Sequence, residues 1–375
     1  MIDTLQFYNT IVKNGIDFFT GVPDSLLKEF CFCITDNTKS QNHIINVNEG
    51  SCVGLSIGYN LATGKIPLVY LQNSGLGNII NPYTSLSHSS VFNVPILFFI
   101  GWRGEPGHED EPQHKFQGKI TQKLLQLLEI DYEILESDNI KSMDQITRII
   151  DKIKVEKKSS AILVKKNTFK KYNFQLQNNK NLLVRENCIN LILSKLSSKD
   201  IIVSTTGKTS REVYELKDNY NYSSPSFYTI GGMGHCNQIS LGISNNTSKR
   251  VFCFDGDGSS LMHLGSLGIT GMNAKDNFHH IIFNNGSHES VGGQPTIADA
   301  LDFKLLSKSL GYKHYTLLEN DITFNKWLKT LNRDNLGPSL TEIKVKSYSR
   351  SNLGRPNETP LEQKASFLNK FNDLK

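Results

Sequence analysis

The chain has 375 residues, of which 38% are hydrophobic and 21% are charged, and its formal net charge is +5 at pH 7. These values are ordinary for a globular protein, and the length predicts two or three domains. No run of 18 apolar residues predicts a membrane span, and the lysine pairs lack the interleaved aromatic residues typical of nucleic-acid binding. We therefore expect a small-molecule partner, and neither a membrane nor nucleic acid.

The six cysteines indicate a reducing compartment. They form no C-x-x-C pair, and several lie in apolar runs, as expected for buried thiols. The N-terminal sequence MIDTLQFYNTIVKNG has no basic segment followed by an apolar stretch, so it does not predict a signal peptide. We expect a cytoplasmic protein.

Helix and strand patterns alternate through the first 164 residues. After a helix at 5–14, a turn containing glycine and proline leads to Asp24 or Ser25, either of which could cap the next helix. Residues 101–118 are expected to form a long loop, and the strand at 161–164 is expected to close the sheet. The predicted strands are 18–23, 44–47, 67–71, 94–100 and 161–164. This alternation predicts a mainly parallel sheet covered by helices on both faces.

A second α/β domain is predicted after a polar segment. Residues 169–184 are rich in lysine and asparagine, which favours a linker. A helix is expected to open near residues 231–234. Further strands are expected at 201–204, 251–254, 279–283 and 339–345. The predicted organisation is one domain at 1–168, the linker at 169–184, and a second domain at 185–375.

Two polar turns follow strands of the second domain. The first is Gly256-Asp257-Gly258, and the second is Asn284-Asn285, which places Asn285 28 positions after Asp257. Because the carboxyl ends of parallel strands meet at one edge of a sheet, we expect both turns at that edge. A carboxylate and an amide oxygen are hard ligands that suit Mg²⁺, and the helix start at Ser259 offers N–H groups to a diphosphate.

The two turns together resemble the signature of thiamine diphosphate enzymes, in which a GDG is followed by NN somewhat under thirty residues later. The resemblance implies the cofactors thiamine diphosphate and Mg²⁺, with the metal held by Asp257, Asn285 and the backbone of Ser287. It also implies an α/β fold with two thiamine diphosphate-binding-type domains, one for the aminopyrimidine ring and one for the diphosphate. The chain has no room for the middle domain that many members carry.

Glu49 and Met233 are further candidates for this site. By itself, Glu49 could be a carboxylate placed at a helix start because the helix dipole favours it there. The resemblance implies that Glu49 hydrogen-bonds the N1′ atom of the aminopyrimidine and activates the cofactor. Met233, next to Gly232 in a glycine-rich turn, could be a core residue, or it could be the bulky side chain that the family uses to bend the cofactor.

Residues 205–212, TTGKTSRE, contain a Gly-Lys-Thr sequence but do not form a phosphate-binding P-loop, because position 202 is Ile where that motif needs Gly. The backbone of Thr206 and Gly207 can still donate N–H groups to a diphosphate. Lys208 and Arg211 could pair with phosphate or with a substrate anion, or they could be ordinary surface charges.

The predicted loop at 101–118 could be a polar surface loop or a lid over the site. As a lid it would supply Arg103 for anion binding and His114 for proton transfer. His288 lies close to the metal turn and is a second candidate for proton transfer. We therefore expect Glu49, His114 and His288 to be catalytic, and Arg103, Lys208 and Arg211 to contact the substrate.

Several unbroken segments are similar to one branch of the family, the phosphonopyruvate and sulfopyruvate decarboxylases. They include FTGVPDSLLK (19–28), NEGSCVGLSIGYNLATGK (48–65), GWRGEPGHEDEPQH (101–114) and NNGSHESVGGQPT (284–296). The resemblance implies a carboxy-lyase that converts 3-phosphonopyruvate to phosphonoacetaldehyde and CO2 in phosphonate biosynthesis. It also implies a homo-oligomer with active sites at subunit interfaces.

Other functions stay open at this point. Sulfopyruvate decarboxylation shares the cofactor and mechanism, and carboligation by another 2-oxo acid enzyme is a broader alternative. A thiamine-binding protein without turnover and a nucleotide-binding module are alternatives of a different class, although no G-x-G-x-x-G follows a predicted strand.

Overall fold

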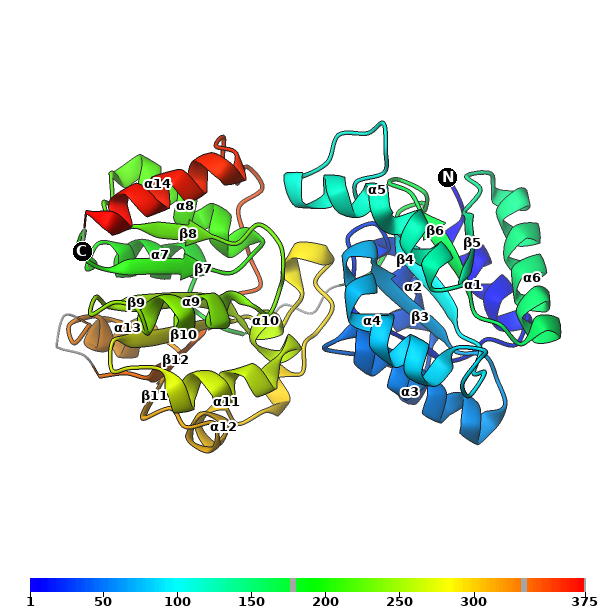
Figure 1. The fold of residues 1–375 in the computed structure, drawn as a ribbon, viewed down its shortest axis with the longest axis horizontal. Coiled ribbons are helices and arrows are strands. Elements are labelled where there is room, and N and C mark those ends of the chain that lie inside the picture. The colour runs from blue at the N-terminus through cyan, green and yellow to red at the C-terminus, as the bar shows by residue number, and fades with distance from the viewer. Residues whose placement is uncertain (176–179, 332–335, 374–375) are drawn as a thin grey trace. The chain divides into compact units, whose positions relative to one another are not determined.

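The computed structural model describes residues 1–175, 180–331 and 336–373. The chain divides into two compact units, Met1–Leu176 and Gln177–Lys375 (Figure 1). Each unit is built around a parallel sheet that has six strands among the described residues, so the predicted fold class is confirmed.

The sheet of the first unit has the strand order β2-β1-β3-β4-β6-β5, and every neighbouring pair is parallel. Its central strands are continuous apolar runs such as LVYL and LFFI, as expected where helices cover both faces of a sheet. The strands are β1 (Phe19–Gly21), β2 (His43–Ile45), β3 (Leu68–Gln72), β4 (Leu97–Gly101), β5 (Asp131–Ile134) and β6 (Ser160–Val164).

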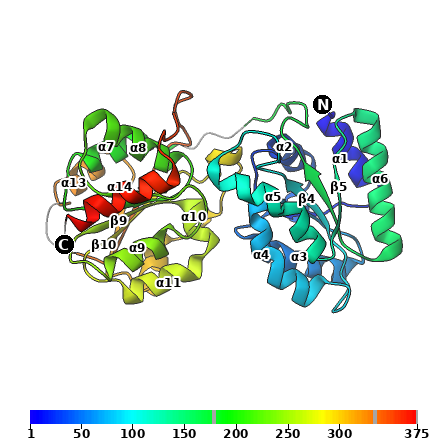
Figure 2. The same cartoon turned by 45° about the horizontal axis from the view of Figure 1, so that its top comes forward.

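The main core of the first unit lies on one face of this sheet, under α1, α2 and α6 (Figure 2). Four aromatic rings meet there, those of Phe7, Phe30, Phe99 and Phe169, with ring centroids 4.8–6.2 Å apart. The helices of this unit are α1 (Thr4–Lys13), α2 (Lys28–Asn37), α3 (Glu49–Thr63), α4 (Leu76–Pro82), α5 (Pro112–Leu127) and α6 (Asn139–Glu156). Helices α3, α4 and α5 cover the other face.

Three sequence-based predictions for the first unit were wrong. The strand at 161–164 does not close the sheet, because β5 lies outside it as the edge strand. The predicted loop at 101–118 ends early, since Pro112 opens α5 and residues 112–118 are helical. Neither Asp24 nor Ser25 caps α2, which begins at Lys28; the Asp24 side chain is fully buried instead.

The sheet of the second unit has the order β11-β12-β10-β9-β7-β8, again with parallel neighbours throughout. Its strands are β7 (Ile201–Ser204), β8 (Ser226–Tyr228), β9 (Val251–Gly256), β10 (Phe278–Asn284), β11 (His314–Leu318) and β12 (Ser339–Lys344). The pair β9 and β10 is central, so the turns that follow these two strands lie side by side at the carboxyl edge.

Successive residues of β9 and β10 face different layers of helices. Phe252, Phe254 and Phe283 pack into the core under α7, α8 and α13. Cys253 and His280, which are register partners on the opposite face, lie toward α9. The helices are α7 (Arg185–Leu193), α8 (Lys208–Tyr220), α9 (Cys236–Ser244), α10 (Asp257–Met262), α11 (Leu264–Asn273), α12 (Phe303–Ser309), α13 (Asp321–Leu328) and α14 (Pro360–Asn372).

The segment predicted as a linker is anchored at both of its ends. Phe169 is buried in the core of the first unit and forms a β-bridge with Ile2. Leu183 is buried in the second unit and forms a β-bridge with Val345. Residues 176–179 of this segment lie outside the described residues.

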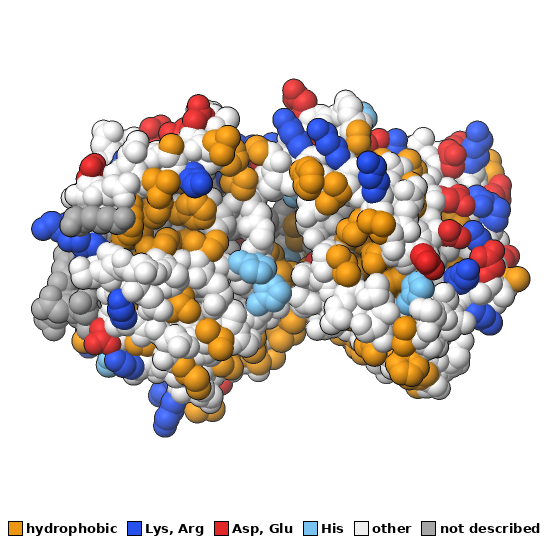
Figure 3. All heavy atoms as spheres, in the orientation of Figure 1, with side chains coloured by type: hydrophobic (Ala, Val, Ile, Leu, Met, Phe, Trp, Pro, Cys, Tyr) orange, Lys and Arg blue, Asp and Glu red, His pale blue; other side chains and the backbone are white. Residues whose placement is uncertain are grey.

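Surface charges of both signs are interspersed on the face drawn in Figure 3, notably where α6 and β5 form one end of the first unit. There Arg148 pairs with Glu133 at 2.7 Å and Lys152 pairs with Asp131 at 2.7 Å. Among the described residues, no helix combines the length and the apolar character that crossing a bilayer requires.

Candidate active site

The two predicted metal-binding turns meet in the structure. Asp257 is the first residue of α10, directly after β9, and Asn285 follows β10. Both side chains are buried, with 2% and 5% exposure. The Asp257 carboxylate accepts a hydrogen bond from the Thr296 hydroxyl at 2.5 Å and is also within hydrogen-bonding reach of the Asn285 backbone N–H.

Burial raises the pKa of the Asp257 carboxyl to about 6, against an ordinary value of 3.8, and the hydrogen bond from Thr296 only partly offsets this. The Asn285 side-chain oxygen accepts the N–H of Ser287 at 3.0 Å. The turn therefore brings the two predicted ligands Asn285 and Ser287 together. A carboxylate, an amide and the Ser287 segment are thus gathered at one edge of the sheet.

Three turns of the second unit are tied together by one hydroxyl. Ser259 Oγ, in α10, accepts the N–H of Gly234 at 3.1 Å and lies 2.9 Å from Thr205 Oγ1. Gly207 and Gly232 have φ values of 93° and 63°. Glycine adopts such positive φ values readily because it has no Cβ. The predicted diphosphate-binding groups on Thr206, Gly207, Gly232, Gly256, Gly258 and Ser259 therefore belong to neighbouring turns. Met233 lies beside Gly232, in the turn that also contains Gly234.

An ion-pair cluster around Glu289 adjoins the turn that carries Asn285. Glu289 accepts hydrogen bonds from Lys208 at 3.0 Å, from Arg185 at 2.9 Å and from the Asn285 amide at 3.1 Å. Arg185 also makes a two-pronged pair with Glu212, at 2.7 and 2.8 Å. Burial alone would raise the pKa of Glu289, but Arg185 and Lys208 outweigh it and hold that pKa below the ordinary value. Lys208 is therefore already paired.

The other two predicted residues of this unit are Arg211 and His288. Arg211 is half-buried on α8, one turn after Lys208. His288 follows the Ser287 segment, and its ring lies against Gly258, where an added Cβ would come within 3.1 Å of the ring. Burial lowers the pKa of His288 to about 4, so its imidazole is neutral near pH 7.

In the first unit, Glu49 opens α3 and is 5% exposed. Its Oε2 accepts a hydrogen bond from the Asn78 amide at 2.7 Å, and burial raises the pKa of this carboxyl. Gly75 packs directly against it, since a Cβ at Gly75 would lie 2.3 Å from Glu49 Oε1. The turn after β3 thus encloses a carboxyl group that has a hydrogen-bonding amide beside it.

The same turn holds the backbone of Arg103. The Asn73 side chain donates to the Arg103 carbonyl at 2.8 Å and accepts the Arg103 N–H at 3.2 Å. The Arg103 guanidinium is bound to the Asp110 carboxylate, with Nε at 2.8 Å, and donates to Ser25 at 3.2 Å. Arg103 is therefore fixed in place by a carboxylate.

His114 lies on the first turns of α5, not in a loop. Its backbone carbonyl packs against Gly104, where an added Cβ would approach to 1.9 Å. Gly118 packs as closely against the Gly104 carbonyl oxygen, which would lie 1.7 Å from a Cβ added at Gly118. This close packing of two backbones fixes the start of α5 against the segment that carries Arg103.

Sequence reasoning interpreted Asp24 only as a helix cap, whereas in the structure it lies after β1 at the carboxyl edge of the first sheet. Its side chain is fully buried and accepts hydrogen bonds from the Gln72 amide at 2.6 Å and from the Leu26 N–H at 2.7 Å. Burial raises the pKa of this carboxyl. Gly101 leaves room for it, since a Cβ there would lie 2.2 Å from Asp24 Oδ2.

Comparison with known proteins agrees with both halves of this arrangement. Residues 5–125 match the model of the thiamine pyrophosphate enzyme N-terminal TPP binding domain, and residues 205–342 match that of the C-terminal TPP binding domain. The chain belongs to the thiamine pyrophosphate enzymes.

Full-length relatives place this thiamine pyrophosphate enzyme among the decarboxylases. It is 30% identical to phosphonopyruvate decarboxylase of Streptomyces viridochromogenes, over 98% of this chain and 94% of the relative. Identity to phosphonopyruvate decarboxylase of Streptomyces hygroscopicus is also 30%, over 98% and 93% of the two chains. Sulfopyruvate decarboxylase of Methanosarcina acetivorans is 26% identical, over 80% of this chain and 81% of the relative.

The residues of the second unit fit thiamine pyrophosphate and a divalent metal. Within the described part of the chain, several buried polar atoms around the metal turn have no hydrogen-bond partner, namely Ser260 Oγ, Ser287 Oγ and both amide atoms of Gln294. Buried polar groups without partners are costly, so their gathering at one place indicates that a polar ligand belongs there. The oxygen donors of Asp257 and Asn285 suit Mg²⁺ better than a softer metal.

Proposed function

We propose that this enzyme decarboxylates 3-phosphonopyruvate to phosphonoacetaldehyde and CO2 with thiamine diphosphate and Mg²⁺, as a step of phosphonate biosynthesis. The observation that carries the proposal is the meeting of buried Asp257 and Asn285 after two adjacent parallel strands, in a family that binds thiamine pyrophosphate. The choice of substrate is supported by the two phosphonopyruvate decarboxylases that match nearly the whole chain.

Asp257, Asn285 and the Ser287 carbonyl would hold the metal, and the diphosphate would take N–H groups from the turns at 205–207, 232–234 and 256–259. When bound, the cofactor supplies a thiazolium that accepts the electrons released as CO2 leaves. Met233 would support the cofactor from the turn it shares with Gly232.

Glu49 would hold a proton at the N1′ position of the aminopyrimidine. Its carboxyl is buried and burial raises its pKa, so it binds a proton more tightly than an exposed glutamate does. Asn78 orients it through the 2.7 Å hydrogen bond to Oε2, which leaves the other oxygen for the cofactor. Burial of Glu49 favours this role because it raises the pKa of the carboxyl group.

The substrate offers a carboxylate and a phosphonate, so cationic side chains should bind it. Arg103, held by Asp110, has a fixed orientation, and Lys208 and Arg211 lie on α8 beside the metal turn. His288 is neutral near pH 7 and could accept or pass on a proton, and His114 at the start of α5 is the other candidate. We propose these five residues for substrate binding and proton transfer.

Sulfopyruvate is the alternative substrate, because the Methanosarcina relative is a sulfopyruvate decarboxylase and matches 80% of this chain. A phosphonate carries two negative charges near neutral pH and a sulfonate carries one. We favour the phosphonate because the two phosphonopyruvate decarboxylases match 98% of this chain and the sulfopyruvate decarboxylase matches 80%.

The direct test is to incubate the purified protein with 3-phosphonopyruvate, with and without thiamine diphosphate and Mg²⁺, and to follow the appearance of the aldehyde. We expect product only when both cofactors are present, and a higher kcat/KM for phosphonopyruvate than for sulfopyruvate. A reversed preference would assign the enzyme to sulfopyruvate, and a coupled carbon–carbon product from pyruvate would assign it to carboligation.

We further propose that the enzyme is a cytoplasmic homo-oligomer. All six cysteines are buried and unpaired, as expected of a protein kept in a reducing compartment. Light scattering of the holoenzyme tests the oligomer, since the chain mass is 42.2 kDa and a dimer would double it.

A further inference from the structure

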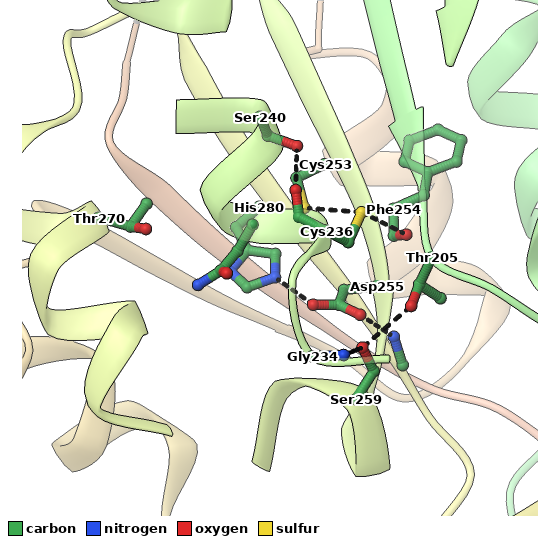
Figure 4. Close-up of polar contacts among 12 residues, drawn as sticks. Thr205, Gly234, Cys236, Ser240, Cys253, Phe254, Asp255, Ser259, Thr270 and His280 are labelled. Atoms are coloured by element: carbon green, nitrogen blue, oxygen red, sulfur yellow. Dashed lines mark hydrogen bonds and ion pairs between the residues drawn. The ribbon is translucent and has the colours of Figure 1, made fainter. Parts of the chain in front are cut away.

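A row of buried polar groups lies between His280 of β10 and the turns proposed to bind the diphosphate. Figure 4 marks the His280–Asp255 contact and, separately, the contacts of Ser259 with Gly234 and Thr205. At the far end of this row, His280 is fully buried and its Nδ1 lies 2.9 Å from the Tyr312 hydroxyl. Its Nε2 faces the Asp255 carboxylate at 3.4 Å. Asp255 is 1% exposed and lies in β9, two residues before the proposed metal ligand Asp257.

At the near end, the Asp255 carboxylate has two further partners, the N–H of Gly256 at 2.9 Å and the hydroxyl of Ser259. A hydroxyl has one proton to donate and two lone pairs that accept. If Ser259 donates to Asp255, it can accept from both Gly234 N–H and Thr205 O–H, which are the two neighbours that the structure gives it. Every hydrogen-bonding position of Ser259 is then used.

A buried carboxylate is costly unless donors or a positive charge compensate it. His280 is the basic side chain that faces Asp255, and it contacts Oδ2, the carboxylate oxygen that does not accept the Gly256 N–H. The contact joins two adjacent strands, because His280 is in register with Cys253 and Asp255 follows on the same face of β9.

We propose that His280 is a positioning residue for the diphosphate end of the cofactor. It holds Asp255, Asp255 orients the Ser259 hydroxyl, and Ser259 fixes the backbone of Gly234 and the side chain of Thr205. The inference rests on the proposed function only in assuming that thiamine diphosphate binds at these turns.

The same cluster has a different possible use. The ligand atoms of Cys253, Asp255 and His280 all lie within 4.8 Å of one another, and Cys236 Sγ is 3.6 Å from Cys253 Sγ. Such a set could take a transition metal. We favour direct contact, because both His280 nitrogens and both Asp255 oxygens already have protein partners. A bound metal is the competing outcome of the test.

The neighbouring histidine provides a matched control. His279 lies on the opposite face of β10, stacks on Phe252 at 4.8 Å and contacts Ser339 at 3.0 Å, outside the chain of contacts. We would compare His280→Leu with His279→Leu by measuring the Kd of thiamine diphosphate and of thiamine monophosphate in saturating Mg²⁺. The ratio of the two Kd values reports how well the diphosphate end is held.

In His280→Leu we expect the preference for the diphosphate over the monophosphate to fall about tenfold, the factor that corresponds to one or two lost hydrogen bonds. His279→Leu should leave the ratio within about twofold of the wild type. Equal weakening of both ligands, or equal effects of the two substitutions, would show a general structural role and overturn the proposal. The metal content of both proteins would be measured by mass spectrometry. About one zinc ion per chain in the wild type and none in His280→Leu would also overturn the proposal.

If His280→Leu does not fold, Ser259→Ala tests the same chain of contacts at its near end, and a wild-type ratio in that variant overturns the proposal. Because the readout is binding, it separates this inference from the proposed reaction. Wild-type protein that binds thiamine diphosphate but releases no aldehyde from phosphonopyruvate would refute the reaction and leave the positioning test intact.

Discussion

Two buried carboxyl groups, one in each unit, occupy similar places in the fold but have different surroundings. Glu49 opens α3 in the first unit and Asp257 opens α10 in the second, and burial raises the pKa of both. Glu49 has the Asn78 amide beside it. Asp257 accepts a hydrogen bond from Thr296 and lies near buried polar atoms that have no partner among the described residues.

The contrast teaches that burial by itself does not define the role of a carboxyl group. We propose that the carboxyl group with one amide neighbour, Glu49, holds a proton, and that the carboxyl group beside other oxygen ligands, Asp257, binds a cation. Substitution of each carboxyl group separates these two roles.

The largest effect is expected from Asp257→Ala. Loss of the carboxylate removes a metal ligand at a buried site, so the variant should lose Mg²⁺-dependent retention of thiamine diphosphate and all measurable decarboxylation. Cofactor retained after gel filtration measures the first effect. Asp276→Ala, at an exposed salt bridge with Lys313, is the control and should behave as the wild type. Full retention in Asp257→Ala would contradict the metal assignment.

Glu49→Gln should separate binding from turnover. The amide keeps the shape of the side chain but cannot exchange a proton, so cofactor Kd should change by less than about threefold while kcat falls on the order of 10²-fold or more. Single-turnover kinetics with saturating cofactor would measure the second effect. Near-normal turnover would remove Glu49 from its proposed role.

If Asp257 binds Mg²⁺, the effect of pH on the stability of the fold should differ with and without the metal. The folded pKa of about 6 exceeds the ordinary 3.8, so the folded protein binds more protons between these values and its stability falls as pH rises from about 4 to about 6. The loss is on the order of 3 kcal/mol in metal-free protein. Glu49 contributes with the same sign, but equally with and without metal.

Mg²⁺ binds the ionised carboxylate and should reverse that loss. The difference in Tm between samples with Mg²⁺ and with EDTA should therefore grow between pH 5 and pH 7, as followed by circular dichroism. Asp257→Asn should abolish the growth. A constant difference across this range would indicate that Mg²⁺ binds elsewhere.

Local sequence was sufficient to predict where Asp257, Asn285 and Glu49 lie in the fold, whereas their roles stay predictions. The turns at Asp257 and Asn285 follow apolar strands, and Glu49 precedes a helix, so a short window of sequence contains each signal. Asp24 also follows a strand, but the helix-capping rule competed for it and gave the wrong result, because α2 begins only at Lys28.

Contacts between distant residues could not be predicted in this way. Glu289 binds Arg185, 104 positions away, and Lys208, 81 positions away, so the pairing of Lys208 appears only after folding. Strand β5 has the sequence DYEI and no buried residue, which is why a search for apolar runs missed it. The helical start of α5 was missed because Gly118, interpreted as a loop residue, is needed for close backbone contact with Gly104.

The smallest effect is expected from a methyl group added beside Glu49. In Gly75→Ala the new Cβ would lie 2.3 Å from Glu49 Oε1, so the carboxyl must move from its place beside Asn78. Small misplacements of a catalytic group are costly, and we expect kcat to fall about tenfold, with a loss of about 1 kcal/mol in stability.

Gly77→Ala is the matched control, because no described atom lies within 4 Å of a Cβ at that position and Gly77 is helical like its neighbours in α4. Alanine is the better helix former, so this control should be as active as the wild type and slightly more stable. If the two substitutions lowered kcat equally, the effect would come from the backbone of the turn. A loss confined to Gly75→Ala would show that the position of the Glu49 carboxyl limits turnover.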